Sequence, residues 1–177
     1  MKIKGATHEF QALPHVKEDV LEIILNLKGM RFKCFSEEPV KLTLKTKGEK
    51  TVTAGDIDAN ADVEIVNPDM KICTITDESG VLEMEITVGR GRGYVPTELR
   101  AGEGNDLGTI AIDSLYSPVR NVGYRVENTR VGEITNYDKL VMTIETDGTI
   151  TPEEAVNQSA KLLIDYFSIL LQTPAAE

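Results

Sequence analysis

Apolar residues recur with the period of a helix in two parts of the 177-residue chain. In the first part they occupy positions 16, 20, 23, 24 and 27, which lie on one face of a helix. Pro14 and the acidic pair Glu18-Asp19 suit the start of this helix, and Lys28-Gly29 suits its end. A second helix is predicted from Thr151 to about Leu171. Its first residues, Thr151-Pro152-Glu153-Glu154, supply a capping threonine, a proline at the first helical position and the glutamate of a capping box.

Between these helices apolar and polar residues alternate, as they do in strands that bury one face. Residues 81–88 show this most clearly, since every second residue from Leu82 to Val88 is apolar. Together with residues 71–76 and a turn at residues 77–80, they predict a β-hairpin. The fold class is therefore α+β with mostly antiparallel sheets. Further strands are predicted at residues 31–35, 40–45, 62–66, 109–115, 119–131 and 139–146.

The elements change character near Ser117-Pro118. Before this point the predicted strands are short, and residues 97–106 are polar enough to predict an exposed loop. After it come two long strands and a helix, and Val122, Tyr124 and Val126 share one face of the first of these strands. The sequence therefore predicts two domains, residues 1–117 and residues 118–177.

The second predicted helix carries two apolar stripes. A single sheet can cover only one stripe, so this helix must be buried on more than one side. A second subunit is the favoured source of the other side, and complete burial within one chain is the alternative. The first stripe consists of Val156, Ala160, Leu163, Phe167 and Leu170, and the second consists of Leu162, Tyr166 and Ile169.

The formal net charge of −10, from 29 acidic and 19 basic residues, argues against direct binding of nucleic-acid phosphates. Partners are therefore expected to be proteins. Cys34 and Cys73 are too far apart in sequence to suggest clustered metal ligands, and two reduced thiols indicate a cytoplasmic protein. The densest apolar stretch, residues 162–171, contains Asp165 and is too short to span a membrane.

Residues 89–93, Gly-Arg-Gly-Arg-Gly, invite an interpretation as an anion site. Val95-Pro96 follows in place of a helix start, so a glycine-rich exit from a strand, with Arg90 and Arg92 available to a partner, is favoured. The alternative is a small anion-binding domain or enzyme. In that case phosphate would stabilise the protein against unfolding by heat, and changing Arg90 and Arg92 would abolish this effect. His8 and His15 have no cysteine nearby, and the acidic pairs suit turns and helix starts. No catalytic residue, metal site or cofactor is therefore predicted.

Five stretches of the sequence stand in a distinctive order. They are VLEIILNLKG at residues 20–29, DVEIVNP at 62–68, GRGRGYVP at 89–96, DSLYSPV at 113–119 and ETDGTITPEEA at 145–155. Together they resemble the amino-terminal assembly domain of the alpha subunit of bacterial or plastid DNA-directed RNA polymerase. The likeness covers nearly the whole chain, and five stretches in register are far more specific than any one of them.

The resemblance implies a non-catalytic scaffold in which residues 1–117 contact the large subunits and residues 118–177 belong to the dimerisation domain. In the family, the alpha dimer forms first and then recruits beta and beta-prime. Lys28 matches a position associated with large-subunit contact, and Ile112 and Val119 match positions associated with beta-prime contact. The proposed contact surface also includes Arg90, Arg92 and Ser117. The implied dimer interface includes Val156, Ala160, Leu163, Tyr166, Phe167 and Leu170.

The sequence departs from the family pattern at both ends. The pattern begins upstream with a strand and a helix, which carries paired arginines, forms half of the dimer interface and contacts beta. It ends with a further domain that contacts promoter DNA and activators. Residues 1–177 hold no counterpart of either, so a weaker homodimer and no direct DNA binding are expected. A free-standing dimerisation module without a polymerase partner is a third interpretation.

Overall fold

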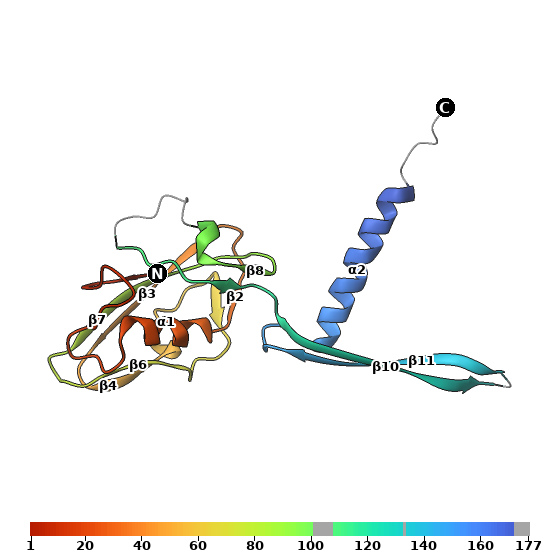
Figure 1. Cartoon of the computed structure of the whole chain (residues 1–177), viewed down its shortest axis with the longest axis horizontal. Helices are drawn as coiled ribbons and strands as arrows, with labels where there is room; N and C mark the ends of the chain where they lie inside the picture. The colour runs from red at the N-terminus through yellow and green to blue at the C-terminus, as the bar shows by residue number, and fades with distance from the viewer. Residues whose placement is uncertain (101–107, 133, 172–177) are drawn as a thin grey trace, which may run out of the picture. The chain divides into compact units, whose positions relative to one another are not determined.

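The computed structural model describes residues 1–100, 108–132 and 134–171. The chain separates into two compact units, unit 1 (Met1–Ser117) and unit 2 (Pro118–Glu177). In the part of the chain that the structure describes, each unit combines antiparallel strands with one α-helix (Figure 1). This confirms the α+β class predicted from the sequence.

A three-stranded sheet in unit 1 has the strand order β1-β7-β3. β7 (Val81–Val88) pairs along its whole length with β3 (Val40–Lys47), and β1 (Lys2–Ile3) pairs with its other edge. The alternation predicted for residues 81–88 is confirmed, because every second residue of β7 points into the core. The buried residues of β7 are Leu82, Met84, Ile86 and Val88.

The hairpin predicted over residues 71–88 is wrong. β6 (Lys71–Ile75) pairs with β4 (Lys50–Thr53) and not with β7. Residues 77–80 form a turn that leads from β6 to β7. In this turn the Gly80 N–H donates a hydrogen bond to the Asp77 carbonyl at 3.0 Å. Alternation could not reveal this pairing, because β6 and β7 both bury apolar residues in the same core.

The first helix, α1 (Val20–Lys28), begins at Val20 rather than at Val16. Asp19 caps it, since its carboxylate accepts a hydrogen bond from the Glu22 N–H at 2.7 Å. Val16 instead forms an isolated bridge with Ile75 of β6. The apolar stripe itself is confirmed, and α1 packs against β6. The buried residues of α1 are Val20, Ile23, Ile24 and Leu27.

Two short ladders and two 3-10 helices complete the described part of unit 1. Of the strand predicted at residues 109–115, only the last two residues form a strand, β9. Of the predicted loop at residues 97–106, the first four residues form a 3-10 helix, and residues 101–106 lie outside the described residues. The remaining elements are β2 (Phe32–Cys34) paired with β5 (Val63–Ile65), β8 (Tyr94–Val95) paired with β9 (Ser114–Leu115), η1 (Ala54–Asp56) and η2 (Thr97–Arg100).

The core of unit 1 consists mainly of aliphatic side chains contributed by α1 and the strands. Full burial of one such side chain stabilises a fold by about 1.5–3 kcal/mol. Cys73 is buried among them, and this burial raises the pKa of its thiol to about 12, so the thiol stays protonated. The largest fully buried residues are Ile3, Ile23, Leu44, Ile72, Ile75, Leu82, Val20, Val52 and Cys73.

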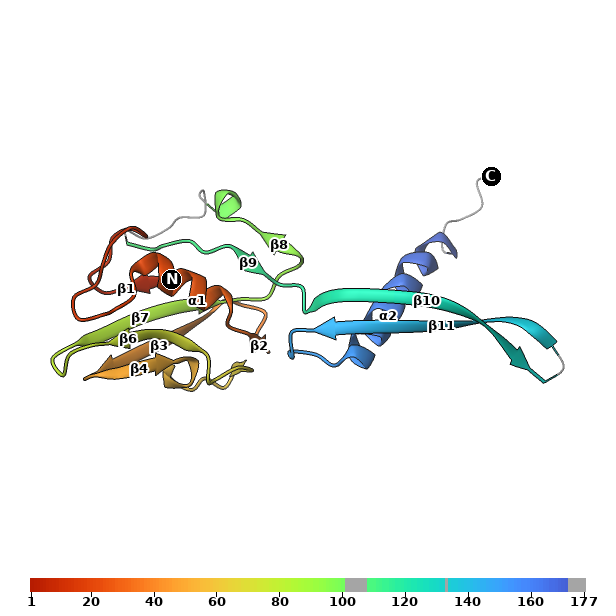
Figure 2. The same cartoon turned by 60° about the horizontal axis from the view of Figure 1, so that its bottom comes forward.

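Unit 2 begins with a long two-stranded ribbon (Figure 2). β10 (Val119–Val131) has the predicted bounds, whereas β11 (Ile134–Thr146) begins five residues before the predicted strand at 139–146. The antiparallel register places apolar residues opposite one another on one face, as predicted for β10. The facing pairs are Val122 with Ile144, Tyr124 with Met142 and Val126 with Leu140.

The second helix, α2 (Pro152–Leu171), begins with the predicted capping box. Thr151 Oγ1 accepts a hydrogen bond from the Glu154 N–H at 3.2 Å, and the Glu154 carboxylate accepts one from the Thr151 N–H at 2.8 Å. The start of α2 therefore follows directly from signals in the sequence. Among the residues that the structure describes, neither helix combines the length and the apolar character needed to cross a membrane.

A buried carboxylate fixes the segment before α1 to β6. Glu18 is 8% exposed and accepts hydrogen bonds from the Thr74 N–H at 2.6 Å and from Lys71 Nζ at 2.8 Å. Burial alone would raise the pKa of Glu18, but the hydrogen bonds from Lys71 and Thr74 outweigh it and hold this pKa below its ordinary value. The sequence assigned Glu18 to the helix start, so its role as a link to β6 is a correction.

We predict that Glu18→Gln lowers the free energy of unfolding by about 1–3 kcal/mol at neutral pH, because a charge-assisted hydrogen bond is lost. The wild-type carboxylate stabilises the fold fully above its unfolded-state pKa, and this contribution disappears as the pH falls through the lower folded-state pKa. Urea unfolding from neutral pH to about pH 3 should therefore show the wild type and the variant converging in acid. The exposed control Glu22→Gln should change the unfolding free energy by less than about 0.5 kcal/mol. A gap that stays constant with pH would contradict the role of Glu18.

Candidate interaction site around Lys28

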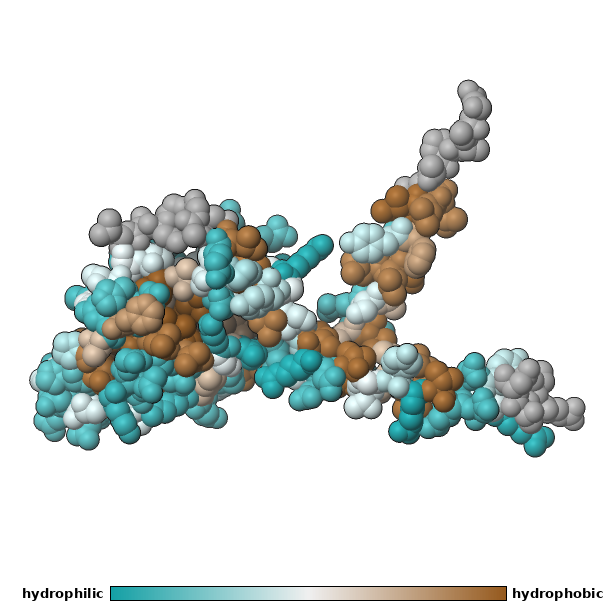
Figure 3. All heavy atoms as spheres, in the orientation of Figure 1, coloured by the Kyte–Doolittle hydropathy of each residue, from teal (hydrophilic) through white to brown (hydrophobic). Residues whose placement is uncertain are grey.

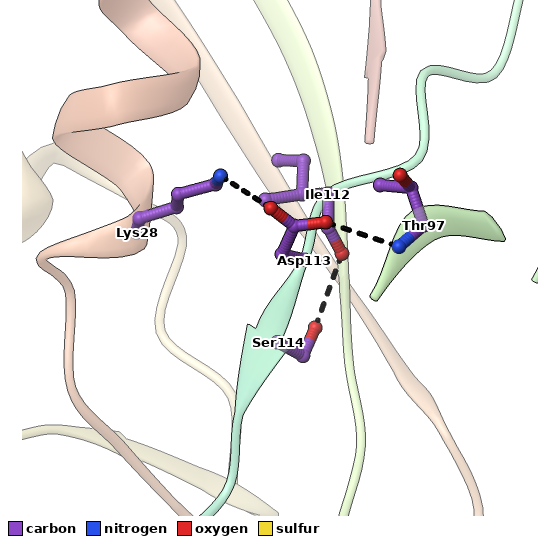
Figure 4. A network of polar contacts seen from close by, with 5 residues as sticks. All are labelled: Lys28, Thr97, Ile112, Asp113 and Ser114. Carbon is purple, nitrogen blue, oxygen red and sulfur yellow. Dashed lines mark hydrogen bonds and ion pairs between the residues drawn. The ribbon is translucent and has the colours of Figure 1, made fainter. Parts of the chain in front are cut away.

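Three segments that are distant in sequence meet at the C-terminal end of α1 (Figure 4). Lys28, in the last turn of α1, places its Nζ 2.7 Å from Oδ2 of Asp113, which directly precedes β9. The other carboxylate oxygen of Asp113 accepts a hydrogen bond at 3.0 Å from the backbone N–H of Thr97, at the start of η2. Asp113 therefore joins α1 to η2.

The ion pair is only partly shielded from water, since the side chains of Lys28 and Asp113 are 37% and 26% exposed. The hydrogen bond from Lys28, followed by that from the Thr97 amide, holds the pKa of Asp113 below its ordinary value. Loss of hydration raises the pKa of Tyr94, and the negative charge of Asp113 raises it further. At neutral pH Asp113 is therefore a carboxylate and Tyr94 a neutral phenol.

The chain that follows Lys28 is held in place by Asn67. The side-chain carbonyl of Asn67 accepts a hydrogen bond from the Arg31 N–H at 2.8 Å, and its amide donates to the Gly29 carbonyl at 3.0 Å. The Arg31 guanidinium donates to the Lys28 carbonyl at 2.8 Å. These bonds satisfy carbonyl groups at the end of α1 that the helix itself leaves unpaired, so they fix the point at which the chain leaves the helix.

The site combines a charged centre with exposed aromatic and apolar side chains. Tyr94 and Leu115 face each other across the β8–β9 ladder and are 59% and 58% exposed. Tyrosine and apolar groups around a charge are typical of protein contact surfaces. Within residues 1–100, 108–132 and 134–171 there is no cluster of His, Cys, Asp and Glu side chains that could hold a metal ion.

Lys28 was predicted from the sequence, whereas the residues that surround it were not. Asp113, Thr97, Tyr94 and Asn67 were given no role of their own. Three of these, Asn67, Tyr94 and Asp113, lie within the stretches that carry the family resemblance. Their place in these stretches was the signal that could have identified them. Their convergence could not be inferred, because it depends on the pairing of β8 with β9 and on the position of η2.

Of the other residues predicted to contact large subunits, Ile112 directly precedes Asp113 in the chain (Figure 4). It is half-buried and packs against the core, and its carbonyl accepts a hydrogen bond from the Ser114 hydroxyl at 3.3 Å. Ser117 is half-buried at the end of unit 1. Val119 belongs to unit 2, where it opens β10 opposite Thr146. The structure therefore brings Lys28 and Ile112 together around Asp113.

Close packing explains Gly91, and backbone conformation explains Gly93. A Cβ atom at Gly91 would lie 2.6 Å from the ring of Tyr116, and Gly93 has φ of 63°, in the left-handed region that favours glycine. The Tyr116 N–H donates to the Gly93 carbonyl at 2.8 Å. β8 follows this loop, in place of the helix N-terminus that phosphate-binding loops use. Arg90 and Arg92 are exposed.

A second candidate surface is the apolar side of unit 2 (Figure 3). Of the α2 residues, all of which the structure describes, only Ala155 is buried. The residues predicted for a dimer interface are exposed, which is the arrangement expected of a surface that a partner covers. Their exposed fractions are 39% for Val156, 57% for Leu163, 58% for Tyr166, 65% for Phe167 and 69% for Leu170, and Ala160 is also exposed.

A family model described as the RNA polymerase Rpb3/RpoA insert domain matches residues 1–117. Over 97% of its length the chain is 48% identical to proteins named DNA-directed RNA polymerase subunit alpha from Alkaliphilus oremlandii and Moorella thermoacetica, and it covers 54% of each. It is 46% identical, over the same share of its length, to the protein of that name from Desulfovibrio desulfuricans, of which it covers 49%. The chain thus spans about half the length of the curated relatives it matches.

We predict that Gly91→Ala lowers the free energy of unfolding by about 1–3 kcal/mol, because the added methyl group forces the Tyr116 ring to move. Gly89→Ala is the matched control, since a Cβ there would meet Pro39 at an ordinary 3.8 Å. Thermal unfolding measures both variants. Equal melting temperatures for the two variants would contradict the packing explanation of the glycine loop.

Proposed function

This chain belongs to the RNA polymerase Rpb3/RpoA insert domain family, and we propose that it is a non-catalytic scaffold subunit of DNA-directed RNA polymerase of the alpha type. The observation that carries the proposal is the 48% identity to alpha subunits over 97% of the chain. The scaffold works in the cytoplasm, where it forms a homodimer and binds beta and beta-prime. Nucleotidyl transfer takes place on the large subunits, and residues 1–177 contribute neither a cofactor site nor direct DNA binding.

In this proposal unit 1 binds the large subunits through a surface centred on Lys28. Support comes from the meeting of several family stretches at this point, since Lys28, Asn67, Tyr94 and Asp113 belong to four of them. The exposed ammonium and the Tyr94 and Leu115 side chains provide the charge and apolar area of a protein interface. In unit 1 the proposed contact set also includes Arg90, Arg92, Ile112 and Ser117, and Val119 is a separate proposed contact in unit 2.

Unit 2 forms the homodimer through α2. The apolar side chains of α2 are left in water by this chain alone, and a second copy related by a two-fold axis would cover them with the same surface. Phe167 and Leu170 lie on one stripe near the C-terminal end of α2 and are 65% and 69% exposed. Their burial would contribute most of the binding free energy, because large apolar side chains dominate interfaces.

We predict that Lys28→Glu reduces recovery of beta and beta-prime when the tagged chain is co-expressed with its cognate large subunits. The introduced carboxylate reverses the charge presented to the partner and repels Asp113. Lys47→Glu, at an exposed position at the end of β3, makes the same charge change elsewhere on unit 1 and should leave recovery unchanged. Recovery of the large subunits by the Lys28→Glu variant at the wild-type level would show that the Lys28 surface is not the contact.

We predict that Phe167→Glu weakens self-association by roughly 30-fold or more, because a charge replaces an apolar side chain at the interface. Asn157→Glu adds the same charge on the polar side of α2 and serves as the control. Sedimentation equilibrium over a range of concentrations measures both dissociation constants. A wild-type chain that stays monomeric, or a variant that dimerises as well as the wild type, would contradict the assignment of α2 to the dimer interface.

A further inference from the structure

The carboxylate of Asp113 is held by donors from two elements, α1 and η2. Oδ2 lies 2.7 Å from Lys28 Nζ of α1, and Oδ1 accepts the Thr97 N–H of η2 at 3.0 Å (Figure 4). Thr97 donates from its backbone and Asp113 directly precedes β9, so the fold itself positions this carboxylate, whether or not Lys28 is present.

Lys28 has no comparable support of its own. A lysine side chain is long and loses much rotamer freedom when it is held in one direction. Its ammonium group carries three N–H donors, and the Asp113 carboxylate accepts one of them at 2.7 Å. With 37% of the side chain exposed, the ammonium can still donate to an acceptor on another molecule. Asp113 therefore sets the direction of a charge that faces outward.

The ion pair between Lys28 and Asp113 is not needed to hold α1 in place. Partly exposed ion pairs contribute little to stability, because water screens them and ordering the side chains costs entropy. α1 is already anchored by its buried apolar stripe and by the hydrogen bond from Asn67 to Gly29. Loss of the Asp113 charge would therefore redirect Lys28 while leaving the fold of unit 1 intact.

We propose that Asp113 is a positioning residue, which orients the Lys28 ammonium toward a carboxylate or carbonyl acceptor on a large polymerase subunit. This inference rests on the proposed function and adds to it a residue that acts through Lys28. An ammonium that is oriented before binding loses less freedom on association, so its contact with the partner is stronger.

A double-mutant cycle tests the proposal. The affinity of the purified chain for its cognate beta and beta-prime subunits is measured for wild type, Asp113→Asn, Lys28→Met and the double variant. Asp113→Asn preserves the size of the side chain and removes the charge that holds Lys28. We expect it to weaken binding roughly tenfold on its own and to have no further effect in the Lys28→Met background.

Controls separate positioning from a structural role. Asp113→Glu retains the charge and should bind more tightly than Asp113→Asn, whereas Asp58→Asn removes an exposed carboxylate elsewhere on unit 1 and should bind as wild type. Urea unfolding should give Asp113→Asn a midpoint near that of the wild type. Additive effects in the double variant, or full affinity of Asp113→Asn when Lys28→Met is weakened, would overturn the positioning role. Failure of the wild type itself to bind either large subunit would instead overturn the proposed function, and the positioning role with it.

Discussion

Apolar side chains must leave water for this chain to be stable, and its two units meet that requirement differently. In unit 1, α1 and the strands enclose aliphatic side chains such as Ile23, Leu44 and Ile75, which are fully buried. In unit 2 the ribbon and α2 leave large residues such as Phe167 in water, and Ala155 alone is buried in α2. Unit 1 therefore supplies its own core, whereas unit 2 presents the kind of surface that association with another chain covers. In the proposed scaffold, unit 1 would display the contacts to the large subunits and unit 2 would form the dimer.

The core of unit 1 also determines where its polar site lies. α1 packs on β6 through its buried stripe, so the end of the helix and Lys28 are fixed relative to the sheet. Asn67 then holds the chain after the helix, and the β8–β9 ladder brings Tyr94 and Asp113 to the same point. Each polar contact is modest on its own. Their common effect is to give an exposed ammonium a defined direction, which is the property that a protein partner can recognise.

Signals that act over a few residues predicted much of this fold, whereas pairings between distant residues did not follow from them. The capping box at Thr151 and the alternation of β7 and β10 depend on local chemistry, and the structure confirms them. The pairing of β6 with β4 depends on contacts across the chain, which alternation cannot encode, and the predicted hairpin was wrong for that reason. Glu18 looked like a helix-start residue because its partners, Lys71 and Thr74, are remote in sequence. Similarly, resemblance pointed to Lys28, but its link to Asp113 emerged only from the fold.

The most direct measurement of the central claim is backbone hydrogen exchange in the chain alone and after mixing with its cognate beta and beta-prime subunits. The account predicts slower exchange on mixing in the three segments that meet at the site, residues 28–31, 94–97 and 113–117. Exchange in residues 40–53, which form β3 and β4, should be unchanged. Unaltered exchange in all three site segments, in a sample where the large subunits are bound, would show that the contact lies elsewhere and would contradict the account.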